Sequence, residues 1–403
     1  MKKQAKAQPM ALLAKTFSGL EQVLAGELNA LGAAGVTPMR RAVAFEGDLG
    51  MMYKTNYWCR TALSIMRHLE EFTFSNKEDF LEKVKQVPWS EYFDVKKTIS
   101  VHPVAHRSEL FNNTMFLAQL TKDGIADHFR EKSGERPSVS NTEPDIRINV
   151  YVNQEKCSLS LDSSGDALFK RGYRKATGGA PINEILAAAL IILSGWDKTS
   201  TFLDPMCGSG TFSIEAGMMA ANMAPAMHRK TFGFSHWKDF DPELLANLQQ
   251  EAREMVTPVK GKILASDIHG KTLDIARQNV MEAGLMGQIR VQRNDFFNFT
   301  PPPENGWVIL NPPYGHRIQQ KDLPEFYQKI GDTLKQKFAG YKAGLFSAEL
   351  EAMKKVGLKP SAKFRLYNGP LESLFLVYEL FEGKHKEHVA KTRPKRPRIK
   401  REN

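Results

Sequence analysis

The residues Asn311-Pro312-Pro313-Tyr314 directly follow the apolar run "WVIL" at 307–310, which has the pattern of a buried strand. Proline cannot donate to a sheet ladder, so the prolines end this strand. The exocyclic amine of a nucleobase is a poor nucleophile because its lone pair is delocalised into the ring. The Asn311 side-chain oxygen and the Pro312 carbonyl can accept from such an amine and orient its lone pair, and Tyr314 can stack on the base. The motif predicts methylation of a base amine; its alternative is a simple strand-ending turn.

A glycine turn in "TFLDPMCGSGTF" (201–212) connects a strand to a helix. Gly208 and Gly210 allow a tight turn close to a ligand, and Thr211 begins a helix with free N–H groups. The third glycine of a dinucleotide fingerprint is absent, and so is the Gly-Lys-Ser/Thr of a nucleotide P-loop. Asp204 ends the strand and can accept from an ammonium group. The pattern favours S-adenosylmethionine, which carries both an ammonium and a carboxylate.

Two further acids follow the next two strands. Asp267 ends "KILASD", where an open parallel sheet presents a ribose-binding acid. Asp295 ends "QIRVQRND" and can accept from an adenine amino group, with Phe296 against the ring. Each acid alone is more often a loop or cap residue. Because the carboxyl ends of parallel strands share one sheet edge, the three acids and Asn311 predict one binding site there.

The elements that position these residues begin at about residue 180. Helical runs alternate there with short apolar strands, as in a parallel sheet covered by helices on both faces. The expected strands are 201–204, 262–267, 288–295, 306–311 and 342–347, with an insertion at 223–248 and an antiparallel hairpin over 363–380. The fold class is therefore α/β, a Rossmann-like sheet ending in a hairpin.

The N-terminal part has a mixed α+β pattern. Residues 10–65 predict a strand, a helix ending at Gly32, a strand at 41–48 and a second helix within 49–69. Residues 70–160 predict strands at 98–107, 145–154 and 156–164 and a helix at 116–134. We expect domains at 1–65, 66–162 and 163–383, and a basic disordered tail at 384–403.

The amino-acid composition indicates which partners the protein binds and in which cellular compartment it is found. The 403 residues carry a formal net charge of +11 and a pI near 9.3, which favours nucleic acid, although a merely basic enzyme is the alternative. The three cysteines have no zinc, redox or disulfide spacing, which fits a reducing cytoplasm. The most apolar stretch, 185–196, is too short to span a bilayer, and no signal peptide is recognised. We expect a cytoplasmic monomer without a metal.

The motifs "FLDPMCGSGTFSIEAG" and "ILNPPYGHR" resemble those of class I S-adenosylmethionine-dependent amino-methyltransferases. The chain from about 10 to 382, including "SLDSSGDALFKRGYRKATGGAPINEILAAALI", is similar to THUMP-containing RNA methyltransferases, most of all to the single-methyltransferase-domain form of the bacterial 23S rRNA guanine-N2 enzymes. The resemblance implies an N-terminal ferredoxin-like element, a THUMP RNA-binding module and methylation of a guanine N2 in large-subunit rRNA. It implies donor contacts at Asp204, Gly208, Gly210, Asp267 and Asp295, and target-amine contacts at Asn311 and Pro312 with a stacking Tyr314.

Basic residues suggest where RNA is held. The linker "FKRGYRK" places cations beside Phe169 and Tyr173, a pairing suited to phosphates and stacked bases, although part of it could instead close over the cofactor. The expected RNA contacts are Lys170, Arg171, Arg174, Lys175 and Arg317, with Arg107, Lys122, Arg130, Lys132, Arg136 and Arg147 in the THUMP region. The alternatives are a transfer RNA guanine-N2 enzyme, a DNA adenine-N6 enzyme and a non-catalytic ribosome-assembly factor.

Overall fold

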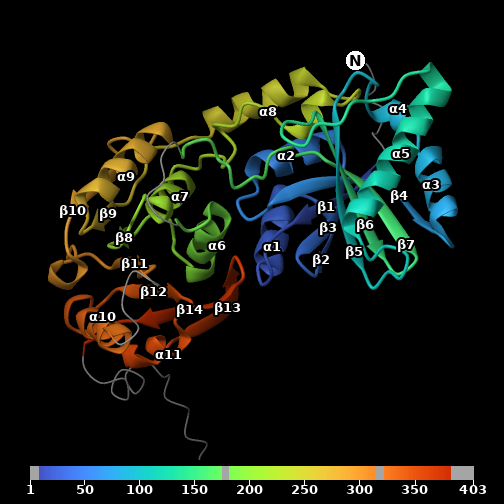
Figure 1. The fold of residues 1–403 in the computed structure, drawn as a ribbon. Helices are drawn as coiled ribbons and strands as arrows, with labels where there is room; N and C mark the ends of the chain where they lie inside the picture. The colour runs from blue at the N-terminus through green and yellow to red at the C-terminus, as the bar shows by residue number, and fades with distance from the viewer. Residues whose placement is uncertain (1–8, 175–180, 314–321, 383–403) are drawn as a thin grey trace, which may run out of the picture.

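The computed structural model describes residues 9–174, 181–313 and 322–382. These residues form two lobes side by side, each built on its own seven-stranded sheet (Figure 1). The N-terminal lobe contains β1 (Met10–Lys15), α1 (Glu21–Leu31), β2 (Ala34–Met39), β3 (Ala42–Gly47), α2 (Leu49–Trp58), β4 (Ser64–Thr73), α3 (Lys77–Gln86), α4 (Trp89–Tyr92), β5 (Ile99–His106), α5 (Thr114–Ser133), β6 (Ile146–Asn153) and β7 (Lys156–Asp162).

The second lobe follows the predicted alternation of helices and strands. It contains α6 (Glu184–Ser194), β8 (Thr201–Asp204), α7 (Thr211–Ala220), η1 (Gly233–His236), α8 (Pro242–Glu254), β9 (Ile263–Asp267), α9 (Gly270–Glu282), β10 (Ile289–Arg293), η2 (Phe296–Asn298), β11 (Gly306–Leu310), α10 (Leu323–Lys337), β12 (Lys342–Ser347), α11 (Leu350–Met353), η5 (Lys354–Val356), β13 (Ala362–Asn368) and β14 (Leu371–Glu379).

The sheet of the N-terminal lobe has the order β2-β3-β1-β4-β7-β6-β5. Neighbouring strands are antiparallel except for the parallel pair β5 and β6. Strand β4 pairs with β1 on one side and with β7 on the other, so the sheet is continuous across the whole lobe. The expected domain boundary between residues 65 and 66 therefore falls inside β4.

The prediction of a second helix within 49–69 is wrong over its second half. Helix α2 ends at Trp58, and residues 64–73 form β4. The main-chain N–H groups of Arg60 and Thr61 donate to the Glu27 carboxylate, at 2.9 Å each, instead of continuing the helix. The sequence reading also missed β2, an exposed edge strand whose Gly and Pro residues give it no strand-like pattern.

The sheet of the second lobe has the order β10-β9-β8-β11-β12-β14-β13. Strands β8 to β12 are parallel, and β14 joins β12 antiparallel, which confirms the predicted Rossmann-like sheet with a terminal hairpin. Successive residues face opposite sides. Phe202 and Ile309 contribute to a core with α6, α7 and α9, whereas Leu203 and Val308 contribute to a core with α10 and α11. The helices thus fix the strand ends that carry the acids.

The insertion between α7 and β9 connects the two lobes. Phe234 stacks on Tyr53 of α2 with ring centroids 4.1 Å apart, and α8 lies over α2 (Figure 1). The guanidinium of Arg229 donates to four main-chain carbonyls, those of Ser164, Asp166, Ala167 and Lys170, at 2.9 to 3.3 Å. The insertion therefore anchors the segment through which the chain passes from one lobe to the other.

Candidate active site

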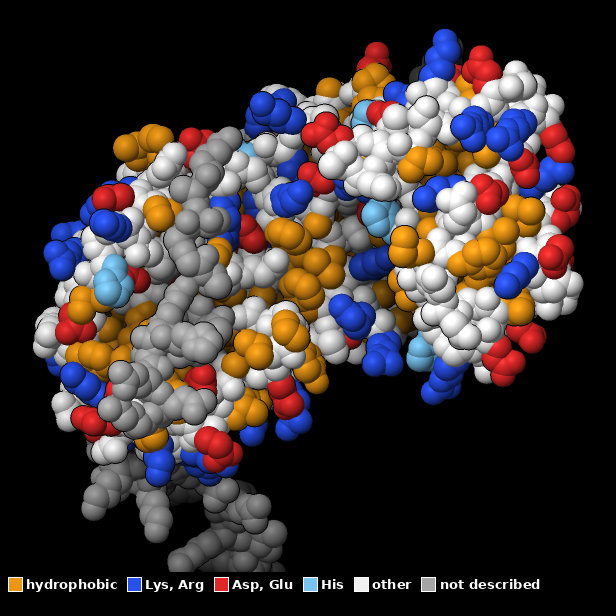
Figure 2. Space-filling view, viewed as in Figure 1, with side chains coloured by type: hydrophobic (Ala, Val, Ile, Leu, Met, Phe, Trp, Pro, Cys, Tyr) orange, Lys and Arg blue, Asp and Glu red, His pale blue; other side chains and the backbone are white. Residues whose placement is uncertain are grey.

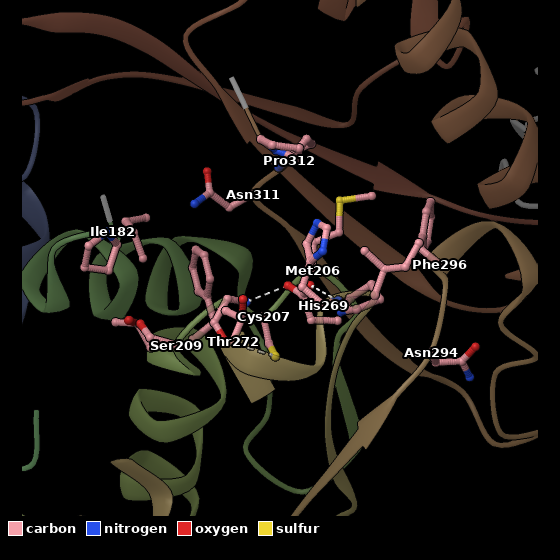
Figure 3. A pocket seen from close by; sticks show the side chains of 18 of the residues that line it. Ile182, Met206, Cys207, Ser209, His269, Thr272, Asn294, Phe296, Asn311 and Pro312 are labelled. Carbon is pink, nitrogen blue, oxygen red and sulfur yellow. Dashed lines mark hydrogen bonds between the residues drawn. The ribbon is translucent and has the colours of Figure 1, made fainter. Parts of the chain in front are cut away.

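A cavity of about 820 Å³ lies at the carboxyl edge of β8, β9, β10 and β11. The loops after these four strands supply most of its wall, at residues 205–209, 267–269, 294–297 and 311–313. Figure 3 shows side chains from all four loops around this space. This volume lies within the usual range for small-molecule sites. The structure thus brings together the strand ends that the sequence motifs singled out.

The glycine turn has the backbone conformation that its sequence requires. Gly208 and Gly210 have φ of +53° and +85°, in the left-handed region that favours glycine. A Cβ at Gly208 would meet no atom within 4 Å, so the backbone of this residue borders open space, and Gly208 and Thr211 line the cavity. Gly210 lies outside the wall, where it caps α7 and packs against Ala276 of α9. This glycine serves the turn itself.

Asp267 lines the cavity at the end of β9. Its Oδ2 accepts from the Gly208 N–H and its Oδ1 from the His269 N–H, both at 3.0 Å. The carboxylate therefore joins the glycine turn to the start of α9. Carboxylate oxygens have about four acceptor positions in total, so Asp267 retains capacity for ribose hydroxyls.

Asp295 and Phe296 lie on the wall that follows β10. The Asp295 carboxylate caps η2, because Oδ1 accepts from the Phe297 N–H at 3.0 Å and Oδ2 from the Asn298 side chain at 2.8 Å. Phe296 is buried and packs against Phe338 at its back while still bordering the cavity. These contacts hold both side chains in place at the cavity wall.

Asp204 differs from the prediction of a direct donor contact. It lies beneath the cavity wall and is fully buried, since its Oδ2 accepts from the Ser213 N–H and hydroxyl at 3.2 and 2.8 Å. Its Oδ1 accepts no hydrogen bond from any residue in the described part of the chain. Burial raises the pKa of Asp204 to about 7. Asp204 therefore fixes the first turn of α7 through Ser213 and does not itself line the cavity.

Asn311 and Pro312 lie in the cavity wall after β11, as predicted (Figure 3). The Asn311 side-chain oxygen is buried and has no hydrogen-bond partner among the described residues. An unsatisfied buried acceptor costs free energy and indicates an unmet partner. The rigid Pro312 holds the adjoining carbonyl. Tyr314 lies outside the described residues.

Two of the expected RNA contacts are internal, so those predictions need correction. The Arg171 side chain is only 2% exposed and pairs with Glu215, and Arg174 pairs with Glu184 at 2.7 Å. Tyr173 is buried as well, so it cannot stack on a base. Of this linker group, Lys170 is exposed and pairs with Asp166. The expected contacts Lys175 and Arg317 lie outside the described residues.

The remaining basic residues are spread over the surface. On the face shown in Figure 2, Lys and Arg side chains occur on both lobes and are interspersed with Asp and Glu. In the THUMP region, Arg130 and Arg147 form ion pairs with Asp127 and Asp166.

Several wall residues were missed by the sequence reading. Ile182 comes from the segment before α6, His269 from the start of α9, and Phe326 from α10. His269 follows Asp267 by two residues and could have been found from that spacing. Ile182 and Phe326 carry no motif, because packing alone brings them to the strand ends.

The described residues contain neither a candidate metal site nor a helix able to span a membrane. No three His, Cys, Asp or Glu side chains within 9–174, 181–313 and 322–382 converge to hold a metal ion. None of the helices in these ranges combines the length and apolar character needed to cross a membrane.

Comparison with family models identifies three consecutive units. Residues 11–66 match the RlmL ferredoxin-like domain, residues 74–162 the THUMP domain and residues 171–376 the RMKL-like methyltransferase domain. The match to a methyltransferase domain agrees with S-adenosylmethionine as the predicted methyl donor.

Known proteins match over nearly the whole chain. A Synechocystis sp. protein named "Putative RNA methyltransferase slr0064" is 39% identical over 90% of this chain and 95% of its own length. The crystal structure of SMU.472, "a putative methyltransferase complexed with SAH", superimposes with a TM-score of 0.85 at 29% identity, covering 94% of this chain and all of that chain. A "predicted N6-adenine-specific DNA methylase" from Listeria monocytogenes gives 0.83 at 28% identity, covering 93% and 97%. The chain belongs to the family of RMKL-like methyltransferases with an N-terminal THUMP domain.

Proposed function

We propose that the protein methylates the exocyclic N2 amine of a guanine in 23S rRNA, with S-adenosylmethionine as the donor. The observation that carries this proposal is the buried side-chain oxygen of Asn311 in the cavity wall, to which no group of the described ranges donates a hydrogen bond. This oxygen is an acceptor without a donor, and an amino group on a base supplies the missing N–H. The donor supplies the methyl group.

The residues of the chain fit the two ends of the donor. The open space beside Gly208 and the N-terminus of α7 suit the carboxylate of the amino-acid part, because helix N-termini attract anions. Asp267 would accept from the ribose hydroxyls, and Asp295 would accept from the adenine amino group beside Phe296. The mechanism then needs only orientation: Asn311 and the Pro312 carbonyl accept from the target amine and direct its lone pair.

The RNA part of the proposal rests on the N-terminal lobe. The THUMP match covers residues 74–162, the RlmL ferredoxin-like match precedes it, and the Synechocystis relative is named as an RNA methyltransferase. The three buried free thiols suit a reducing cytoplasm, where we propose that the protein acts as a monomer. A paired guanine would have to leave its helix to reach Asn311.

A second candidate is methylation of an adenine N6. The Asn-Pro-Pro-Tyr motif suits any exocyclic base amine, and the Listeria neighbour is named as an adenine methylase. The two candidates differ in the modified nucleoside and not in the geometry of the acceptors.

Mass-spectrometric mapping of modified nucleosides tests the proposal. We expect 23S rRNA from cells lacking the protein to lose N2-methylguanosine at one position, and the wild-type gene to restore it. Asn311→Ala should fail to restore it, with activity in vitro reduced at least ~100-fold because the amine is no longer oriented. Asn311→Ala should still bind S-adenosylhomocysteine. Loss of N6-methyladenosine, or of a modified nucleoside from transfer RNA alone, would contradict the guanine-N2 rRNA assignment.

A further inference from the structure

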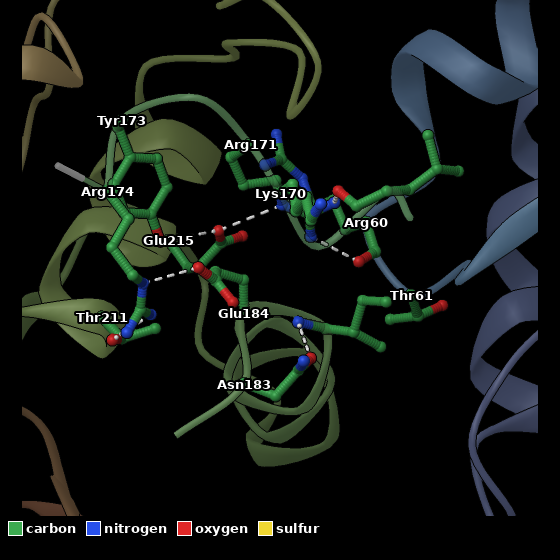
Figure 4. A network of polar contacts seen from close by, with 12 residues as sticks. Arg60, Thr61, Lys170, Arg171, Tyr173, Arg174, Asn183, Glu184, Thr211 and Glu215 are labelled. Atoms are coloured by element: carbon green, nitrogen blue, oxygen red, sulfur yellow. Dashed lines mark hydrogen bonds and ion pairs between the residues drawn. The ribbon is translucent and has the colours of Figure 1, made fainter. Parts of the chain in front are cut away.

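A group of buried charged side chains lies between the N-terminal lobe and helix α7. Figure 4 shows its members around the segment 171–174, which enters the second lobe. The Arg171 and Glu215 side chains are 2% and 0% exposed, and Nε of Arg171 lies 3.3 Å from Oε1 of Glu215. The Tyr173 hydroxyl donates to the same oxygen at 3.3 Å. These groups cannot contact RNA, so they require another explanation.

Arg174 makes three hydrogen bonds to two segments, the stretch 182–184 and the start of α7. Its guanidinium donates to Oε1 of Glu184 at 2.7 Å, to the Ile182 carbonyl at 3.3 Å and to the Thr211 hydroxyl at 2.9 Å. Ile182 and Thr211 both line the cavity. A single side chain outside the cavity wall therefore fixes two parts of that wall relative to each other.

Arg171 extends the same network toward the N-terminal lobe. It donates to the Leu168 carbonyl at 2.9 Å and to the Arg60 carbonyl. The main-chain N–H of Arg60 donates in turn to Glu27 of α1 at 2.9 Å. A continuous chain of hydrogen bonds thus runs from α1 to α7.

The two arginines hold one face of α7. Their partners Thr211 and Glu215 are four residues apart, and side chains at this spacing lie on the same side of a helix. Only arginine has the planar fork of donors that serves several acceptors at once, whereas a lysine ammonium acts as a point charge. Removing one member of a buried charged network leaves the others unpaired, which is costly.

We propose that Arg174 is a positioning residue for methyl-donor binding, because it holds Ile182 and the first turn of α7 at the cavity. Arg171 connects this network to the N-terminal lobe. The inference rests on the proposed function, because it takes the cavity as the donor site. It assigns the linker arginines a role in donor affinity instead of RNA contact.

Isothermal titration of the full chain with S-adenosylhomocysteine tests this role. Arg174→Lys keeps the positive charge beside Glu184 but loses the fork, so we expect the Kd to rise ~10-fold, as for one to two lost charged hydrogen bonds. In steady-state assays the KM for S-adenosylmethionine should rise by a similar factor, while kcat at saturating donor stays within ~2-fold. A variant that is merely less folded would lose kcat, because fewer molecules are active. The matched control is Arg365→Lys, an exposed arginine of β13 paired with Glu372, which should change neither value.

Three outcomes are decisive. An unchanged Kd for Arg174→Lys, with the control also unchanged, overturns the positioning role. If Arg174→Lys does not fold, Glu184→Gln is measured instead, because it weakens the same contact; we expect a ~3-fold rise in Kd, and no rise overturns the inference. Absence of binding to the wild-type chain contradicts the proposed function itself, so the two failures are distinguishable.

Discussion

At the scale of single residues, some carboxylate and amide oxygens of the site accept hydrogen bonds from the protein and others do not. Asp267 and Asp295 accept hydrogen bonds from neighbouring loops, which fixes their orientation at the cavity. Within the residues that the structure describes, Asn311 and Asp204 each keep one buried oxygen without a partner. Such atoms are costly in the free protein, and these two lie at and beneath the cavity wall.

The buried carboxyl of Asp204 should make stability depend on pH. Burial raises its pKa from 3.8 to about 7, so the native state retains this proton to higher pH than the unfolded state. The protonated Asp204 carboxyl therefore contributes fully to the free energy of unfolding below pH 4, and this contribution is lost as the pH rises to about 7. Asp204→Asn is neutral at every pH and should be more stable than the wild type at pH 8, by roughly 4 kcal/mol, because the shift spans about three pKa units. The difference should shrink toward pH 5 in urea unfolding.

Asp274→Asn is the control for this measurement. Asp274 is 76% exposed and pairs with Arg277, so its replacement should give the same small change at both pH values. A difference between Asp204→Asn and wild type that does not vary between pH 5 and pH 8 would refute the raised pKa.

Sequence reasoning located the site but not the environment of every residue in it. Asn311, Asp267 and Asp295 were placed correctly in the wall, because parallel strands deliver their ends to one edge. Arg171 and Arg174 were misassigned, because a cation beside aromatic residues has the same pattern whether it faces RNA or a buried glutamate. Burial depends on elements distant in the sequence, here α1 and α7.

At the scale of elements, the strands of the second lobe were predictable because each is short, apolar and bounded by turns. Helix α2 and strand β4 were not separable by pattern, since the apolar spacing continues through 59–63. The break depends on Glu27, which lies more than thirty residues earlier and captures two main-chain N–H groups. Long-range hydrogen bonds of this kind leave no local signal.

The insertion between α7 and β9 should stabilise the folded protein, because its Arg229 binds the segment that joins the two lobes. Arg229→Met leaves four main-chain carbonyls without their donor, and we expect a loss of roughly 2–4 kcal/mol in the free energy of unfolding. Arg229→Lys should give an intermediate loss, because an ammonium has three donors. Urea unfolding measures both variants.

Arg253→Met provides the comparison within α8. Among the described residues, the Arg253 side chain bonds only the neighbouring Gln250 side chain, so its replacement should change the free energy of unfolding by less than ~0.5 kcal/mol. If Arg229→Met were as stable as Arg253→Met, the anchoring role of the insertion would be wrong.

At the scale of the whole molecule, charge determines how RNA is approached. The net charge is +11, and Lys and Arg dominate residues 384–403, which lie outside the described residues. Deleting 384–403 should lower the affinity for rRNA and reduce the slope of log K against log salt, because fewer counterions are released. Filter binding at several salt concentrations measures the slope.

A variant in which the Lys and Arg residues of 384–403 become Gln serves as the matched control. It keeps the length of the segment and should reproduce the deletion. An unchanged slope in both variants would show that this segment takes no part in RNA binding.

Strand β4 has a consequence for how this architecture can be divided. Strand β4 pairs with both β1 and β7. Separating the ferredoxin-like region from the THUMP region therefore exposes two unpaired strand edges, each able to pair with another chain. Gene rearrangement that moved only one half would yield a protein prone to aggregation. The N-terminal lobe should therefore be inherited, transplanted and expressed as a single indivisible piece.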